Sequence, residues 1–170
     1  MKDLTQLRRQ LGSTGLFVSP IGFGASGLGG VFESIDEDEG IAAVRLAFEL
    51  GINLFDTSPY YGDTRSEKVL GRALSFLPRR EIVVCSKVGR YGPSDFDFSA
   101  ERVTRSVHES LERLGLDYLD LVQCHDIEFG DLAQISRETL PALAILKSEG
   151  KIRHIGITGL PLAIFRAILE

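Results

Sequence analysis

The segment INLFDTSPYYG, residues 52 to 62, decides how the rest of the chain is interpreted. Its first half is a short run of apolar and β-favouring side chains, which is typical of a buried strand. The run stops at a carboxylate, Asp56, and two tyrosines, Tyr60 and Tyr61, follow within five residues. An ordinary polar turn would explain this ending, and so would a loop that carries a reactive tyrosine.

Four more runs of the same character occur along the chain. Together with the first run they start roughly 30 to 37 residues apart, which is the length of a βα repeat. The four runs are SPIGFG (19–24), EIVVCSK (81–87), LDLVQCH (119–125) and IRHIGIT (152–158).

Amphipathic helical patterns fill the gaps between the runs. One begins after Ser99, a typical N-cap residue, and ends at Gly115, where a glycine suits the helix C-terminus. Another contains Pro141, which should bend or break the helix. The helices expected in this way cover residues 36–51, 66–77, 99–115 and 131–150.

Nearly continuous apolar strands that alternate with helices indicate an α/β protein with a parallel sheet. No linker divides the chain, so we expect a single domain over residues 1–170, with a small hairpin in residues 7–19 before the first strand of the sheet. A doubly wound sheet and a (β/α)8 barrel are the two candidates. Gly22, Gly24 and Gly27 match the dinucleotide pattern G-x-G-x-x-G, but the next helix begins only near Asp36, so we expect a flexible loop there.

Composition narrows the class of ligand. A net charge of −5 and a pI near 5.3 argue against nucleic acid as a partner. No apolar run approaches the roughly 18 residues of a membrane span, so a cytoplasmic protein without a membrane partner is expected. The two cysteines, Cys85 and Cys124, lie inside strand-like runs, and we expect both to be reduced thiols. No His or Cys cluster suggests a metal site.

Three strands in succession end in an ionisable residue: Asp56, Lys87 and His125. In a parallel barrel the carboxyl ends of the strands open onto one face, so these side chains should meet there. Tyr61 lies on the loop after Asp56 and could turn back over the same mouth, close to Lys87.

This grouping would suit proton transfer. An ammonium about 4 Å from a phenol stabilises the phenolate by roughly 4 kcal/mol at an effective dielectric constant of 20. Asp56 would hold Lys87 charged and oriented, and a neutral His125 could donate a hydrogen bond to a substrate oxygen.

Other polar residues near the expected mouth have a simpler interpretation. Tyr91, Asp126 and Glu128 lie on loops that could contact a sugar, although ordinary loop polarity explains them as well. Arg65 and Glu67 are expected to solvate the start of a helix.

The motifs around these residues resemble the aldo-keto reductase family, in the family's order along the chain. They are LGSTGLFVSPIGFG (11–24), NLFDTSPYYG (53–62), SKVGRYG (86–92) and SLERLGLDYLDLVQCH (110–125). The resemblance implies a catalytic tetrad of Asp56, Tyr61, Lys87 and His125, with Tyr61 and His125 also binding the substrate. It further implies NAD or NADP as cofactor, held in part by Asp56, Thr158 and Gly159.

Further blocks, such as GFGASGLGGVF (22–32) and CHDIEFG (124–130), resemble the aldose dehydrogenases of this family. This implies oxidation of an aldose at C1 to a lactone, as in ascorbate synthesis, with a small sugar or carbonyl compound as substrate. Two alternatives remain open: a general NADP-dependent aldehyde or ketone reductase, and a noncatalytic binding remnant.

A complete barrel has eight strands and typically about 250 residues. This chain supplies a hairpin and about five of the eight βα units, so we expect a partial (β/α)8 TIM barrel whose domain is incomplete at the C-terminus. Whether such a chain is active, and in what oligomeric state, stays open at this stage.

Overall fold

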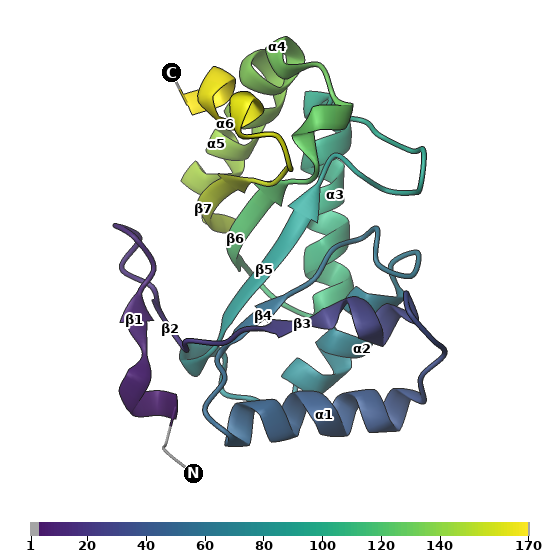
Figure 1. Cartoon of the computed structure of the whole chain (residues 1–170), viewed down its shortest axis with the longest axis vertical. Coiled ribbons are helices and arrows are strands. Elements are labelled where there is room, and N and C mark those ends of the chain that lie inside the picture. The colour runs from purple at the N-terminus through teal and green to yellow at the C-terminus, as the bar shows by residue number, and fades with distance from the viewer. Residues whose placement is uncertain (1–3, 170) are drawn as a thin grey trace.

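A computed structural model describes residues 4–169 and contains a five-stranded parallel sheet flanked by helices (Figure 1). Neighbouring strands follow the chain in the order β3-β4-β5-β6-β7, as successive βα units of a barrel would. All five predicted strands are confirmed: β3 (Phe23–Gly24), β4 (Leu54–Asp56), β5 (Val83–Val88), β6 (Leu119–Cys124) and β7 (Ile152–Ile157). Residues 1–3 and 170 of the expected domain lie outside the described part.

The helices pack against one face of this sheet. Alternate strand residues such as Phe55, Val84 and Val122 point into a buried core shared with the helices. Residues of the opposite register, including Asp56 and Lys87, line the face that would be the interior of a barrel. The main helices are α1 (Glu37–Glu49), α2 (Arg65–Leu74), α3 (Ala100–Leu114), α5 (Leu140–Ser148) and α6 (Leu162–Leu169).

The predicted signals for α3 are confirmed. The Ser99 hydroxyl accepts a hydrogen bond from the Arg102 backbone N–H at 3.4 Å, and Gly115 ends the helix with φ 65°. The helix predicted around Pro141 is divided, but the change lies before this residue, and Pro141 is the second residue of α5. A short turn, α4 (Leu132–Gln134), is followed by a π-helical segment (Ile135–Thr139), and α5 begins only after it. Proline has no N–H and cannot donate the next backbone hydrogen bond of an α-helix. The wider π-helical turn therefore lies just before it.

The predicted hairpin is also present, as the antiparallel pair β1 (Arg9–Gln10) and β2 (Phe17–Val18). Asn53, just before β4, attaches it to the sheet: its side-chain nitrogen donates to the Phe17 carbonyl at 2.8 Å, and its side-chain oxygen accepts from the Ser19 N–H at 2.7 Å. The hairpin therefore lies beside the amino-terminal ends of the strands (Figure 1), away from the strand ends that carry the predicted site.

One expectation about the glycine-rich segment is wrong. Residues Ala25–Gly29 form a short 3-10 helix with Ala25 and Leu28 buried, where a flexible loop was expected. The next α-helix starts at Glu37, so the G-x-G-x-x-G pattern does not open an α-helix. The packing of Leu28 explains why the segment is ordered.

The sulfur chemistry is as expected. Cys85 and Cys124 are free and buried, and burial raises the pKa of both thiols to about 12. Within residues 4–169, no helix is both long and apolar enough to cross a membrane.

Candidate active site

The carboxyl ends of β4 and β5 form an ion pair at the centre of the site. The Lys87 Nζ lies 2.6 Å from an Asp56 carboxylate oxygen and donates to the Thr57 backbone carbonyl at 2.8 Å. Lys87 is only 5% exposed. Because an ammonium has three N–H donors, these two bonds leave one hydrogen for a third partner.

Tyr61 lies near the remaining hydrogen of the Lys87 ammonium. The Lys87 Nζ lies 4.9 Å from the centroid of the Tyr61 ring, and the His125 ring meets Tyr61 edge-on at 5.7 Å. The structure thus brings together all four residues predicted from sequence, Asp56, Tyr61, Lys87 and His125. Tyr60 contacts His125 too, at 5.9 Å, but its ring lies beneath Arg90 instead of Lys87.

His125 follows the last residue of β6 and is 5% exposed. Its Nδ1 lies 3.1 Å from the Ser58 hydroxyl. Burial lowers the pKa of His125 to about 4, and the positive charges of Lys87 and Arg90 act in the same direction, while Asp126 opposes them. The imidazole is therefore neutral near pH 7, and one of its nitrogens can donate a hydrogen bond.

This lowered pKa predicts a loss of stability in acid. Folding lowers the pKa of His125 from 6.5 to about 4. The contribution of the neutral imidazole to the free energy of unfolding is therefore complete above pH 6.5 and disappears as the pH falls through 4. We expect the free energy of unfolding to decrease by about 3 kcal/mol over this range because of this one residue. Urea titrations at pH 7 and pH 4 should show a smaller decrease in His125→Gln. The exposed His108 gives the control: if His108→Gln reduces the pH dependence as much as His125→Gln does, the assignment is wrong.

A close backbone contact fixes the loop that carries Tyr61. A Cβ added to Gly29 would lie 2.5 Å from the Tyr61 carbonyl oxygen, and one added to Gly62 would lie 1.9 Å from the Gly29 carbonyl oxygen. Gly62, Asp63 and Thr64 follow one another with φ of 64°, 50° and 69°, a left-handed turn that is costly for the last two residues. The turn leads directly into α2 and stays in place because the 3-10 helix at Ala25–Gly29 packs against it.

We therefore expect Gly29→Ala to destabilise the protein by about 1–3 kcal/mol, the range for an overpacked site. The Tyr61 loop should move as well, because the clash is with its backbone. Thermal unfolding together with backbone amide shifts of residues 60–64 would measure both effects. Gly27→Ala is the matched control, since a Cβ at Gly27, on the same 3-10 helix, meets nothing within 4 Å. Equal effects of the two substitutions would contradict the role of this contact.

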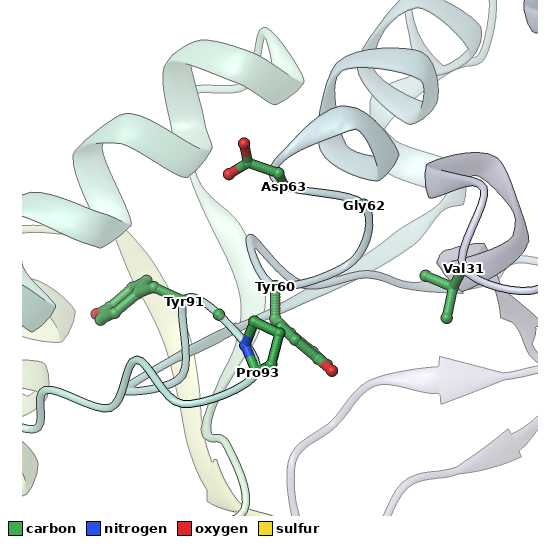
Figure 2. Close-up of a pocket in the computed structure, with 7 residues that line it drawn as sticks. Val31, Tyr60, Gly62, Asp63, Tyr91 and Pro93 are labelled. Atoms are coloured by element: carbon green, nitrogen blue, oxygen red, sulfur yellow. The ribbon is translucent and has the colours of Figure 1, made fainter.

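A cleft of about 400 Å³ is lined in part by Tyr60 and Gly62, the two residues that flank Tyr61 in the chain (Figure 2). The Tyr60 ring lines the cleft and also contacts the His125 ring, so the cleft adjoins His125. Tyr91 also lines it, but its hydroxyl accepts a hydrogen bond from the Gly89 N–H at 3.1 Å and points away from Tyr60 and Pro93 in Figure 2. Burial raises the pKa of this phenol. The cleft is lined by Val31, Tyr60, Gly62, Asp63, Tyr91, Gly92 and Pro93.

The site also contains an ion pair, between Arg90 and Asp126, that was not predicted from the sequence. Arg90 Nη1 lies 2.5 Å from an Asp126 carboxylate oxygen, and the same oxygen lies 3.6 Å from His125 Nε2. The guanidinium of Arg90 covers the Tyr60 ring at 4.0 Å. Since Arg90 and Asp126 each follow a predicted site residue by three positions or fewer, their position just past two strand ends was the available signal. Asp126, considered earlier as a possible sugar contact, is thus engaged within the protein.

Thr158 and Gly159 lie on the loop after β7, against the loop that follows β6. The Thr158 hydroxyl accepts from the Asp126 N–H at 2.9 Å and donates to Asp126 Oδ1 at 3.4 Å, so both bonds go to a partner inside the protein. A Cβ at Gly159 would lie 2.6 Å from the Glu128 Oε2 atom. Glu128 contacts the same loop a second time, because its other oxygen accepts from the Leu160 N–H at 3.1 Å. The part of these residues in cofactor binding stays a prediction.

Comparison with known proteins gives a consistent result. The model of the Aldo/keto reductase family matches residues 20–170. L-Galactose dehydrogenase of Arabidopsis thaliana is 62% identical over 164 residues, which are 95% of this chain and 51% of that protein. D-Arabinose 1-dehydrogenase of Saccharomyces cerevisiae is 45% identical over 90% of this chain and 46% of its own length.

A solved aldo-keto reductase of Bacillus halodurans, in its holo form, superposes with a TM-score of 0.83. It is 34% identical and matches 95% of this chain and 53% of its own. The chain spans about half the length of the curated relatives it matches.

Proposed function

The chain belongs to the aldo/keto reductase family, and from this premise we propose that it serves an NAD- or NADP-linked oxidation of an aldose at C1 to a lactone. The observation that carries the proposal is the position of the Lys87 ammonium, held between Asp56 and the Thr57 carbonyl with the Tyr61 ring 4.9 Å away. The resemblance to L-galactose dehydrogenase makes L-galactose the first substrate to test. With that substrate, the activity would belong to ascorbate synthesis, in the cytoplasm.

The residues at the mouth fit a nicotinamide cofactor in part. One carboxylate oxygen of Asp56 binds Lys87, and the Asp56 side chain is 38% exposed, so it can still accept a bond from a ligand. Gly159 has no side chain to cover its backbone, whereas the Thr158 hydroxyl is already bound to the Asp126 N–H. We therefore assign cofactor contacts to Asp56 and Gly159, with Thr158 supporting the loop. When bound, NAD or NADP supplies the hydride acceptor.

The chain's own residues would manage the proton. In the oxidation, Tyr61 Oη accepts the proton of the C1 hydroxyl, and the nearby Lys87 ammonium stabilises the phenolate that exists before this transfer. Asp56 keeps Lys87 charged and oriented. The neutral imidazole of His125 donates a hydrogen bond to the substrate oxygen and thereby fixes its position relative to Tyr61. Reduction of a carbonyl compound reverses the proton transfer.

The proposal can be tested by following the reduced nicotinamide after purified chain is mixed with L-galactose and either NAD or NADP. D-Arabinose and a simple aliphatic aldehyde serve as comparison substrates, because they separate an aldose dehydrogenase from a general carbonyl reductase.

We also propose that residues 1–170 belong to a single domain, since the five parallel strands β3 to β7 share one sheet.

A second protein sharpens the test, because this chain spans only about half of its relatives. It is a fusion of this chain with the part of the Arabidopsis relative that the chain does not match. Turnover of L-galactose by the fusion but not by the chain supports the proposed chemistry. It also shows that the added part supplies contacts to cofactor or substrate that the chain lacks. A folded fusion that binds neither cofactor nor substrate would refute the proposal and favour a noncatalytic binding function.

A further inference from the structure

Ser58 connects the loop that carries Tyr61 with the imidazole of His125. It lies two residues after the end of β4, and it is completely buried. Its Oγ lies 3.1 Å from His125 Nδ1 and accepts a hydrogen bond from the Tyr60 N–H at 3.2 Å. Both partners are therefore residues of the site.

Counting hydrogen-bond donors and acceptors assigns a direction to the Ser58 bond. A hydroxyl has one proton and two lone pairs, and the Tyr60 N–H, which can only donate, occupies one lone pair. Among residues 4–169, His125 Nδ1 is the one acceptor within hydrogen-bond distance of Ser58 Oγ. A buried hydroxyl proton without an acceptor is costly, so Ser58 donates to Nδ1. A neutral imidazole that accepts at Nδ1 carries its hydrogen on Nε2.

The surroundings of the other ring nitrogen lead to the same tautomer. His125 Nε2 lies 3.6 Å from an Asp126 carboxylate oxygen. A hydrogen on Nε2 is attracted by this carboxylate, whereas a bare lone pair would be repelled by it. Lys87, Arg90, Tyr60 and Tyr61 complete the charged and titratable surroundings of the ring.

We propose that Ser58 is a positioning residue that holds His125 as the Nε2–H tautomer and sets the orientation of the ring. In this state the imidazole offers a donor on the side of Asp126, while the Ser58 side of the ring is an acceptor. The catalytic consequence, a hydrogen bond from Nε2–H to the substrate oxygen, rests on the proposed function. The tautomer itself is a property of the chain without any ligand.

Long-range 1H–15N correlation spectra of the 15N-labelled chain near pH 7 test this directly. The chain has 3 histidines, so the signals of His125 can be assigned by their loss in His125→Gln. We expect a hydrogen on Nε2 and an unprotonated Nδ1 whose resonance shows that it accepts a hydrogen bond. A hydrogen on Nδ1 would overturn the proposal without any variant.

Variants isolate the contribution of Ser58. Ser58→Ala should shift the His125 Nδ1 resonance toward that of an unbonded acceptor, and Ser58→Thr, which keeps the hydroxyl, should restore it. Ser110→Ala is the control, since Ser110 is an equally buried serine on α3 and its loss should leave the His125 signals unchanged. A Ser58→Ala protein that is folded and keeps both ring resonances of the parent would overturn the proposal; if that variant does not fold, the parent spectrum and Ser58→Thr still decide.

The kinetic test is separate from the spectroscopic one. In a form that turns over, Ser58→Ala should lower kcat by about tenfold with KM changed far less, because a donor to the substrate oxygen is misplaced. If a folded fusion with the remainder of the Arabidopsis relative neither turns over nor binds cofactor or substrate, the proposed function fails, while the spectra of the chain still decide the role of Ser58.

Discussion

Replacement of Tyr61 by phenylalanine is expected to lower kcat for aldose oxidation by about a thousandfold, within the range for loss of a general acid–base group. The substitution removes one oxygen and keeps the ring that contacts Lys87 at 4.9 Å and His125 at 5.7 Å. Folding should therefore be preserved, and thermal unfolding of parent and variant should agree. Steady-state rates of nicotinamide reduction measure the loss in whichever form of the protein turns over.

The neighbouring tyrosine provides the matched control. Tyr60→Phe also removes one phenolic oxygen, but the Tyr60 ring lies beneath Arg90 and lines the cleft without contacting Lys87. We expect its effect on kcat to stay below about tenfold, which corresponds to about 1.4 kcal/mol of activation free energy. If Tyr60→Phe caused the larger loss, the assignment of the reactive phenol would have to be exchanged. Lys87→Met should resemble Tyr61→Phe, since it removes the cation that stabilises the phenolate.

The convergence of Asp56, Lys87 and His125 was predictable for a physical reason. Each is an ionisable residue that closes an apolar strand, and consecutive strands of a parallel sheet end at the same edge. Local composition was sufficient, because strand, end and charge are neighbours in sequence. The same holds for the caps at Ser99 and Gly115, which directly adjoin the helix that they delimit.

Contacts between distant segments could not be predicted in this way. The contact of Gly29 with Gly62 depends on how two loops pack, and neither glycine alone indicates it. The hydrogen bond of the Thr158 hydroxyl could not be predicted either, since Thr158 follows β7 and its partner Asp126 follows β6. Spacing along the chain reveals residues of one element well, but it carries little information about which polar groups already satisfy one another.

Glu67 shows the limit most clearly. It was expected to solvate the start of a helix, and that interpretation is wrong: Glu67 is 0% exposed on α2. One carboxylate oxygen accepts from the Ser86 hydroxyl at 2.6 Å, and the other lies 2.6 Å from Arg113 Nε. The carboxylate thus joins α2, β5 and α3 behind the sheet, on the side opposite Lys87.

Glu67→Ala should lower the free energy of unfolding by about 3–5 kcal/mol, the range for removal of one partner of a buried ion pair. The cost is large because Arg113 Nε, on a side chain that is 16% exposed, and the buried Ser86 hydroxyl would both lose their acceptor. Urea-induced unfolding of parent and variant measures it. Glu67→Gln can still accept from the Ser86 hydroxyl but has no charge to pair with Arg113, so we expect a smaller decrease in the free energy of unfolding than for Glu67→Ala.

The control for Glu67 is Glu37→Ala, which removes a carboxylate that pairs with Arg72 on the surface, where the two side chains are 43% and 57% exposed. A pair of this kind contributes about 0–1 kcal/mol, so a loss for Glu67→Ala no larger than that for Glu37→Ala would contradict the prediction. Glu67 binds the hydroxyl of Ser86 on β5, the strand that also carries Lys87 on its opposite face. Loss of the Glu67 contact should therefore lower the local stability of β5. Amide hydrogen exchange along residues 83–88 would then increase in Glu67→Ala and stay at the parent level in Glu37→Ala.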